Sequence, residues 1–210
     1  HVIQTSDKHN VNFGIRNGKF VTGYVTSDEI SSAVAGTPGS HEPFDTLVSG
    51  LGWLVRGGSV YVDESFHRRS PPAHPSAEDA DSPLYSSTYG EDMSAQTSGE
   101  QFPTLLSART ALGHNAEGRL MLLQVEGESW VRGMSLREFA AFALELGFHS
   151  AINLDGGGSA TMRVNDTLVS EPSWQCTPDD YESGGASRLL PLEQTYCEKR
   201  VSSVTCIHSM

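Results

Sequence analysis

The sequence VNFGIRNGKFVTGYV at residues 11–25 is the strongest local signal for the fold. Its two arms, residues 11–16 and 19–25, are rich in Val, Phe, Ile and Tyr, and the pair Asn17-Gly18 separates them. Asn and Gly tolerate the positive φ angles of a type I′ turn, and the residues of the arms favour extended backbone. The stretch therefore predicts a two-stranded antiparallel β-hairpin.

Two more strand pairs are predicted further along the chain. Gly57-Gly58 joins residues 53–56 to residues 59–62, again with β-branched and aromatic residues in both arms. Residues 105–114 and 119–125 form the third pair around a turn. The apolar run in its second arm predicts a strand that is buried on both faces.

One amphipathic helix is predicted between Ser135 and Gly147. Ser135 and Glu138 have the spacing of a capping box, and apolar residues follow at helical spacing up to the glycine. The segments predicted as strands after the helix are residues 151–154, 160–164, 167–169 and 201–207. Many strands and few helices indicate an α+β fold with a mixed, mostly antiparallel sheet.

The composition limits the size of the fold and the class of partner. A chain of 210 residues has room for one domain, residues 1–210, and residues 66–103 are rich in Ser, Pro, Asp and Glu. We expect those residues to be a flexible insertion, with a lid over a site as the alternative. The formal net charge of −12 repels nucleic acid, so no nucleic-acid partner is expected.

Three cysteines, Cys176, Cys197 and Cys206, lie in the last 35 residues. That region is rich in Pro, Gly and Ser, so we expect one disulfide there, involving Cys176 or Cys197. The odd thiol would be buried, or paired outside this chain. The cysteines are too far apart in sequence for a zinc knuckle, and no metal site is predicted.

The segment Asp155-Gly156-Gly157-Gly158-Ser159 is the strongest candidate for a binding site. Three glycines after an apolar strand are expected where backbone must approach a ligand closely, and their amides can bind an anion. The Asp155 carboxylate and the Ser159 hydroxyl would lie beside that anion. A tight turn capped by the aspartate is the alternative. The spacing matches neither the P-loop nor the dinucleotide-binding motif.

Arg109 and Thr110 lie within an otherwise apolar stretch of small residues. A guanidinium in such a place needs an anionic partner, which is either a structural carboxylate or a substrate phosphate. His114 follows near the predicted turn and could donate a hydrogen bond to a phosphate or a leaving group. An exposed histidine in a turn is the alternative.

Two motifs, SARTALGH at residues 107–114 and INLDGGGSAT at residues 152–161, resemble the phosphodiester glycosidase family. Shorter stretches that support the resemblance are FGIR at 13–16, VTGY at 21–24, WLVR at 53–56, NDTL at 165–168 and VSSVTC at 201–206. The upstream glycine-aromatic motif of that family has no counterpart here. We therefore expect residues 1–210 to correspond to the C-terminal part of the catalytic domain.

The resemblance implies a glycosidase that removes N-acetylglucosamine from a sugar-1-phosphodiester and exposes mannose 6-phosphate. Asp155 would be the base or nucleophile, with Arg109 and His114 acting on the phosphate and Glu126 as a weaker second carboxylate. No metal and no cofactor are required. The residues expected to bind the substrate are Thr110, Asn153, Gly157, Gly158 and Ser159.

Two other functions stay open at this point. A metal-dependent phosphodiesterase would break the P–O bond instead of the glycosidic bond. A non-catalytic carbohydrate-binding module would use the same glycine segment to hold a sugar without turning it over.

The resemblance also places the protein in the secretory pathway, in the Golgi lumen or secreted. The sequon Asn165-Asp166-Thr167 falls on a predicted turn, so we expect glycan on Asn165. The expected substrate partner is a phosphodiester-linked sugar on glycoprotein glycans. Because a sheet that lacks upstream strands has an open edge, the expected protein partner is the upstream segment of the same domain or, in a homo-oligomer, a second copy.

Overall fold

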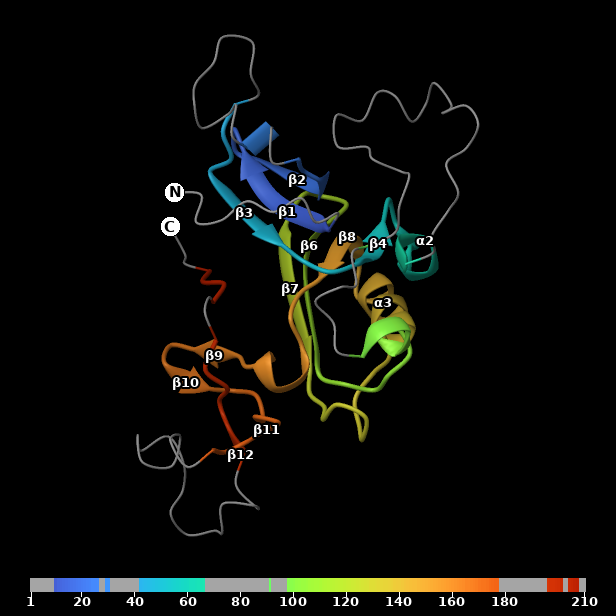
Figure 1. Ribbon diagram of the computed structural model, residues 1–210. Helices are drawn as coiled ribbons and strands as arrows, with labels where there is room; N and C mark the ends of the chain where they lie inside the picture. Colours follow the sequence, from blue (N-terminus) through green and yellow to red (C-terminus); the bar gives the residue numbers. More distant parts are fainter. Residues whose placement is uncertain are drawn as a thin grey trace. The chain divides into compact units, whose positions relative to one another are not determined.

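The computed structural model describes residues 10–26, 29–30, 42–66, 91, 98–177, 196–201 and 204–207, in which the chain forms two compact units (Figure 1). The first unit holds the described residues up to Leu105 together with Thr110–Leu123 and Ser135–Leu154. The second unit holds Leu106–Arg109, Gln124–Met134 and the described residues from Asp155 onward.

A three-stranded antiparallel sheet opens the first unit. It has the order β2-β1-β3, with β1 at Val11–Arg16, β2 at Lys19–Tyr24 and β3 at Thr46–Ser49. Asn17 and Gly18 have φ angles of 51° and 68°, which are the positive values that a type I′ turn requires. The predicted hairpin is confirmed.

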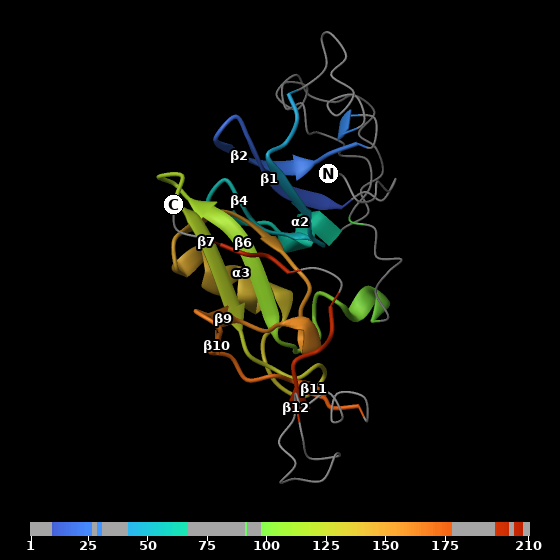
Figure 2. The same ribbon diagram turned by 90° about the vertical axis from the view of Figure 1, so that its left-hand side faces the viewer.

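A five-stranded sheet forms the centre of the first unit (Figure 2). Its order is β5-β4-β8-β6-β7, and β8 pairs antiparallel with both β4 and β6. The strand bounds are Trp53–Arg56 for β4, Ser59–Val60 for β5, Arg109–Asn115 for β6, Leu120–Val125 for β7 and Phe148–Asn153 for β8.

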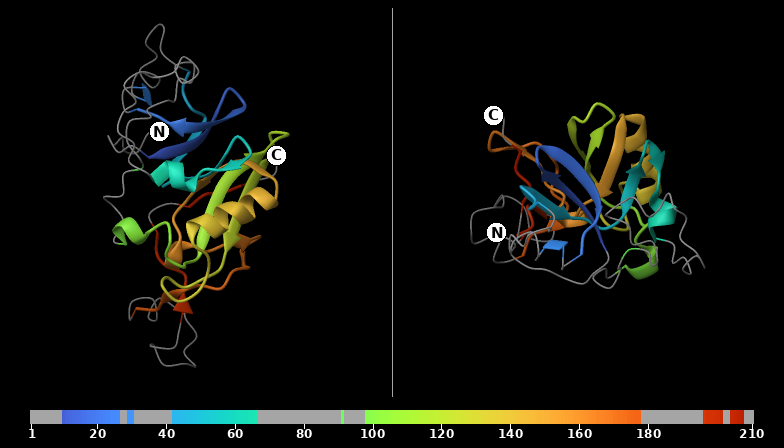
Figure 3. Two further views of the ribbon diagram at one scale, coloured as in Figure 1. Left: turned by 90° about the vertical axis from the view of Figure 1, so that its right-hand side faces the viewer. Right: turned by 90° about the horizontal axis from the view of Figure 1, so that it is seen from above.

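Helix α3, at Leu136–Glu145, packs against β4, β5 and β8 of this sheet (Figure 3). It begins with the predicted capping box between Ser135 and Glu138, and Gly147 follows it with a φ of 96°. The other helical segments of the first unit are α2 at Val62–Phe66 and the 3₁₀ turn η2 at Gly99–Gln101. No helix in the described part of the chain is long and apolar enough to cross a membrane.

The apolar core of the first unit lies between its two sheets. Val11 and Phe13 of β1 meet three buried residues of the five-stranded sheet, Trp53, Leu112 and Ile152. Leu54, the next residue along β4, is also fully buried. Since successive side chains of a strand point to opposite faces, β4 is covered on both sides.

Glu91 is buried in the same unit and is the one residue described between residues 67 and 97. Its carboxylate accepts hydrogen bonds from the Val11 amide at 3.2 Å, the Tyr24 hydroxyl at 3.0 Å and the Ser65 hydroxyl at 3.3 Å. Burial raises the pKa of Glu91 to about 7. This carboxyl group therefore links β1, β2 and α2.

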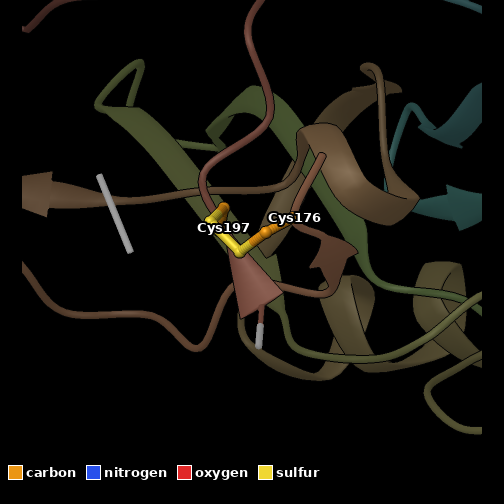
Figure 4. Close-up of a disulfide and its surroundings, with 2 residues drawn as sticks. All are labelled: Cys176 and Cys197. Carbon is orange, nitrogen blue, oxygen red and sulfur yellow. A yellow bond between two sulfur atoms is a disulfide. The ribbon is translucent and has the colours of Figure 1, made fainter. Parts of the chain in front are cut away.

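The second unit is built from short elements. After the 3₁₀ turn η3 at Gly157–Ser159 come two small hairpins, β9 (Arg163–Val164) with β10 (Thr167–Leu168) and β11 (Trp174–Gln175) with β12 (Tyr196–Cys197). A disulfide joins Cys197 of β12 to Cys176, which follows β11, with Cα atoms 5.1 Å apart (Figure 4). Cys206 is free and exposed. The predicted disulfide is confirmed.

The predicted α+β class with mostly antiparallel strands and few helices is confirmed, and three local predictions are wrong. Strand β5 ends at Val60, because α2 begins at Val62. Strand β7 is not buried on both faces, since Leu120 and Leu122 are each 37% exposed at the sheet edge. Residues 201 and 204–207 form no strand.

The predicted flexible insertion at residues 66–103 lies largely outside the described residues. Residues 202–203 of the predicted C-terminal strand also lie outside them.

Candidate active site

The glycine segment forms a single 3₁₀ turn in the second unit, directly after Asp155. The Gly157 amide donates to the Ala108 carbonyl at 2.9 Å, which attaches the turn to the residue before Arg109. The Ser159 amide donates to the Gly156 carbonyl at 3.0 Å and closes the turn. The structure thus brings the two motifs of the sequence, residues 107–114 and 152–161, together at Ala108 and Arg109.

Close backbone approach explains why glycines occupy this turn. A Cβ atom on Gly156 would lie 2.5 Å from the Ala108 carbonyl oxygen. Gly157 has a φ of +53°, and a Cβ atom there would lie 2.8 Å from the hydroxyl of Ser129. Any other residue would push the turn away from the segment that carries Arg109.

The amides of the glycine loop differ in whether they already have a hydrogen-bond acceptor. The amides of Gly157 and Ser159 were expected to bind a phosphate, but both already donate to main-chain carbonyls. The Gly156 amide donates to the Asp155 Oδ1 at 2.9 Å. Among the described residues, the main-chain hydrogen bonds that hold the loop do not include the Gly158 amide, so this amide and the Ser159 hydroxyl are the donors that we retain for a ligand.

Arg109 and Asp155 lie in contrasting environments at this loop. Arg109 is only 2% exposed, and its Nε donates to the Met134 carbonyl at 3.0 Å. Burial lowers the pKa of the guanidinium to about 10, so the group is still a cation at neutral pH. The Asp155 side chain is exposed to solvent, where a substrate could reach its carboxylate.

The other predicted site residues belong to the first unit. The Thr110 carbonyl accepts from the Leu154 amide at 2.8 Å. The Asn153 Nδ2 donates to the Leu51 carbonyl at 3.1 Å, and its buried Oδ1 has no hydrogen-bond partner in the described part of the chain. His114 lies five residues beyond Arg109 along β6, where its ring stacks on Phe20 at 5.6 Å between ring centroids.

The structure adds neighbours of the glycine loop that the sequence did not indicate. The hydroxyls of Ser107 and Ser129 are 2.9 Å apart and border Gly157. The Trp174 ring packs against Gly158, and the Lys199 ammonium lies 4.8 Å from the centre of that ring. Ser107 begins the motif at residues 107–114, whereas Ser129, Trp174 and Lys199 lie outside both motifs and are far apart in the sequence, so only the fold could place them at this loop.

Carboxylates other than Asp155 have different surroundings. Glu126, the predicted second carboxylate, is exposed and accepts from the Glu171 amide at 2.8 Å, so one of its oxygens holds the chain in place. Among the described residues, no three His, Cys, Asp or Glu side chains are grouped as a metal site would need.

The two motifs that converge at Ala108 are the ones that resemble the phosphodiester glycosidase family, and comparison with known proteins agrees. The phosphodiester glycosidase family model matches residues 1–182, so the chain belongs to this family. The cattle N-acetylglucosamine-1-phosphodiester alpha-N-acetylglucosaminidase is 36% identical over 200 residues, and the human one is 34% identical. These alignments cover 95% of this chain but only 30% and 31% of the relatives.

A solved structure agrees with the fold as well. The catalytic domain of the zebrafish N-acetylglucosamine-1-phosphodiester alpha-N-acetylglucosaminidase, auto-inhibited by its pro-peptide, matches with a TM-score of 0.71 and 32% identity. The match covers 99% of this chain and 55% of the zebrafish chain.

Proposed function

We propose that this chain provides part of a glycosidase that cleaves N-acetylglucosamine from a sugar-1-phosphodiester and exposes mannose 6-phosphate on glycoprotein glycans. The observation that carries the proposal is the placement of a buried cation, Arg109, and an exposed carboxylate, Asp155, at one glycine loop. The names of the cattle and human relatives support the choice of substrate.

The two charges suit different parts of one transition state. A phosphomonoester is a good leaving group, and Arg109 would stabilise the negative charge that grows on it. The anomeric carbon becomes cationic as the glycosidic bond breaks, and Asp155 would meet it as base or nucleophile. The Gly158 amide and the Ser159 hydroxyl would orient the phosphate between them.

Several parts of the prediction stay predictions. Thr110, Asn153 and His114 are retained as candidate substrate contacts, and the upstream segment and a homo-oligomer as candidate protein partners. We also propose that residues 1–210 are the C-terminal part of the catalytic domain and that the protein resides in the secretory pathway.

The first test is turnover of the methyl diester of N-acetylglucosamine 1-phosphate, measured with and without an added upstream segment of a relative. In ¹⁸O-labelled water, the label should enter the released sugar, because the C–O bond breaks. Label in the phosphate would instead indicate a phosphodiesterase, and binding without turnover would indicate a carbohydrate-binding module.

The second test is Asp155→Asn, which keeps an Oδ1 acceptor for the Gly156 amide and so preserves the loop. Turnover should fall by about a hundredfold or more while substrate binding stays nearly intact, because the charge acts in the transition state. Asp166→Asn, in the exposed turn between β9 and β10, is the matched control and should leave turnover unchanged. Near-normal turnover of Asp155→Asn would show that the carboxylate is structural.

A further inference from the structure

A short loop at residues 127–133, here called the Trp130 loop, lies against the glycine loop within the second unit. Glu128 and Arg132 pair at its base, with the Glu128 amide donating to the Arg132 carbonyl at 2.9 Å. At its side, the Ser129 hydroxyl lies 2.9 Å from that of Ser107 and borders Gly157. The Trp130 loop therefore borders the site proposed above.

The backbone of the Trp130 loop is held firmly in place. The Trp130 amide donates to the Leu106 carbonyl at 2.8 Å, and Met134 exchanges two hydrogen bonds with Ser107. Gly133 has a φ of +118° and packs so closely on the Ser107 carbonyl that a Cβ atom there would collide with it. The loop thus presents its tip, Trp130 and Val131, in one defined position.

Trp130, at the tip, has a strained backbone conformation and a side chain that is largely exposed to solvent. Trp130 has a φ of 73°, a left-handed value that is rare for bulky residues and costs about 1–3 kcal/mol of local strain. Its side chain is 60% exposed, so the core gains little from it. A glycine would suit this backbone better, which indicates that the ring itself is used.

The other two tryptophans do not share this feature. Trp53 is 5% exposed and belongs to the core of the first unit. Trp174 supports Gly158 from one side and carries Lys199 on its ring. Trp130 is accordingly the exposed indole, and it follows directly after Ser129, whose hydroxyl borders the glycine loop.

An indole face is chemically matched to the apolar C–H face of a pyranose ring, and a ring with only two side-chain torsions loses little entropy on binding. We propose that Trp130 is a substrate-binding residue whose indole stacks on a hexopyranose of the phosphodiester. This inference rests on the proposed function, and it adds the residue that would hold the sugar while Arg109 and the glycine loop hold the phosphate.

The test compares Trp130→Gly and Trp130→Phe with the control Val131→Ala at the same exposed tip. Two substrates are used, the methyl diester of N-acetylglucosamine 1-phosphate and the diester that carries mannose in place of methyl. Trp130→Gly should raise KM about tenfold with a smaller change in kcat. Trp130→Phe, which keeps an aromatic ring, should have a KM close to that of wild type. The melting temperature of Trp130→Gly should not fall, because glycine relieves the positive φ.

The pattern over the two substrates identifies the stacked ring. A KM change with both substrates assigns the ring to N-acetylglucosamine, and a change confined to the mannose diester assigns it to mannose. If the KM of Trp130→Gly stays within about twofold of wild type for both substrates, the proposal is overturned. It is also overturned if the loss of activity in Trp130→Gly is accompanied by a lower melting temperature.

Failure of the proposed function would look different, since wild-type protein would turn over neither diester. In that case, methyl α-N-acetylglucosaminide and methyl α-mannoside are titrated while tryptophan fluorescence is recorded. A saturable change that Trp130→Gly lacks would still support stacking, and no change in wild type would overturn it.

Discussion

Arg109 shows how a residue in an unusual environment identifies a site. Arg109 is one of only 14 Lys and Arg residues in the chain, and it is 2% exposed. Burying a cation costs free energy, so its surroundings must compensate. The Met134 carbonyl does so in part, by accepting from Nε. In the proposed function the guanidinium would also face the substrate phosphate, where burial keeps its charge little screened by water.

We expect Arg109→Lys to reduce turnover of the phosphodiester by about a hundredfold while free N-acetylglucosamine binds almost as before. Lysine keeps the charge but has no counterpart to the Nε donor that reaches Met134, and it cannot grip two phosphate oxygens as a planar fork does. Steady-state kinetics and sugar titration would check this. The exposed Arg119→Lys is the control, and equal losses in turnover and in sugar binding would contradict the assignment.

At this scale the sequence predicted segments that the structure brings together, but it did not predict which of their atoms are available to a ligand. The glycines and Arg109 were predicted together, and they do meet at Ala108. Which amides remain for a ligand depended on the hydrogen bonds of one turn, and those follow from the three-dimensional path of residues 107–108. The sequence did not indicate Ser129 and Trp130, because a seven-residue loop that begins and ends with glycine has no periodicity to analyse.

Among the elements, local signals were reliable where the chemistry is local. The Asn17-Gly18 turn and the capping box of α3 depend on a few adjacent residues, and both are confirmed. The burial of β7 depends on which strands flank it, and its place at the sheet edge exposes Leu120 and Leu122. Val201 and residues 204–207 form no strand, and the sequence there, which alternates only in part, does not indicate a pairing partner.

Glu91 connects elements in a way that makes stability depend on pH. Its folded pKa of about 7 lies above its ordinary value of 4.5, so the native protein holds a proton that the unfolded chain releases between these values. The stabilisation from this group is thus complete below about pH 4.5 and is lost as pH rises through 7. Burial, the largest cause, opposes the charged form more than the hydrogen bonds from Tyr24, Val11 and Ser65 favour it.

We expect the contribution of Glu91 to the free energy of unfolding to fall by on the order of 2 kcal/mol between pH 5 and pH 8. Glu91→Gln removes the charge and keeps one acceptor oxygen, which can accept from the Val11 amide while the new NH2 group donates to the Tyr24 hydroxyl, so it should remove this slope and be at least as stable as wild type at pH 8. Urea unfolding at several pH values would measure it, with the exposed Glu64→Gln as control. A constant difference between Glu91→Gln and wild type at every pH would argue against a raised pKa.

For the whole molecule, the family was predictable because its motifs are contiguous, whereas the division into two units was not. Both units are discontinuous in sequence, since the second takes Leu106–Arg109 and Gln124–Met134 from within the first. No composition shift marks those boundaries. The glycine loop, the Trp130 loop and Arg109 all belong to the second unit. The candidate site is therefore built from three separate segments of the sequence.

The last prediction concerns the compartment in which the whole molecule folds, and it rests on Asn165. Asn165 and Asp166 have φ angles of 49° and 63° at the exposed tip of the β9–β10 hairpin, where a glycan would meet no core residue. We expect full-length protein from a secretory host to carry glycan at Asn165, alongside the Cys176–Cys197 disulfide that an oxidising compartment permits. Asn165→Gly keeps the left-handed turn and removes the acceptor, so it should lose the added mass without a lower melting temperature. Peptide mapping that finds Asn165 unmodified in the secreted protein would count against passage of this site through the glycosylation machinery.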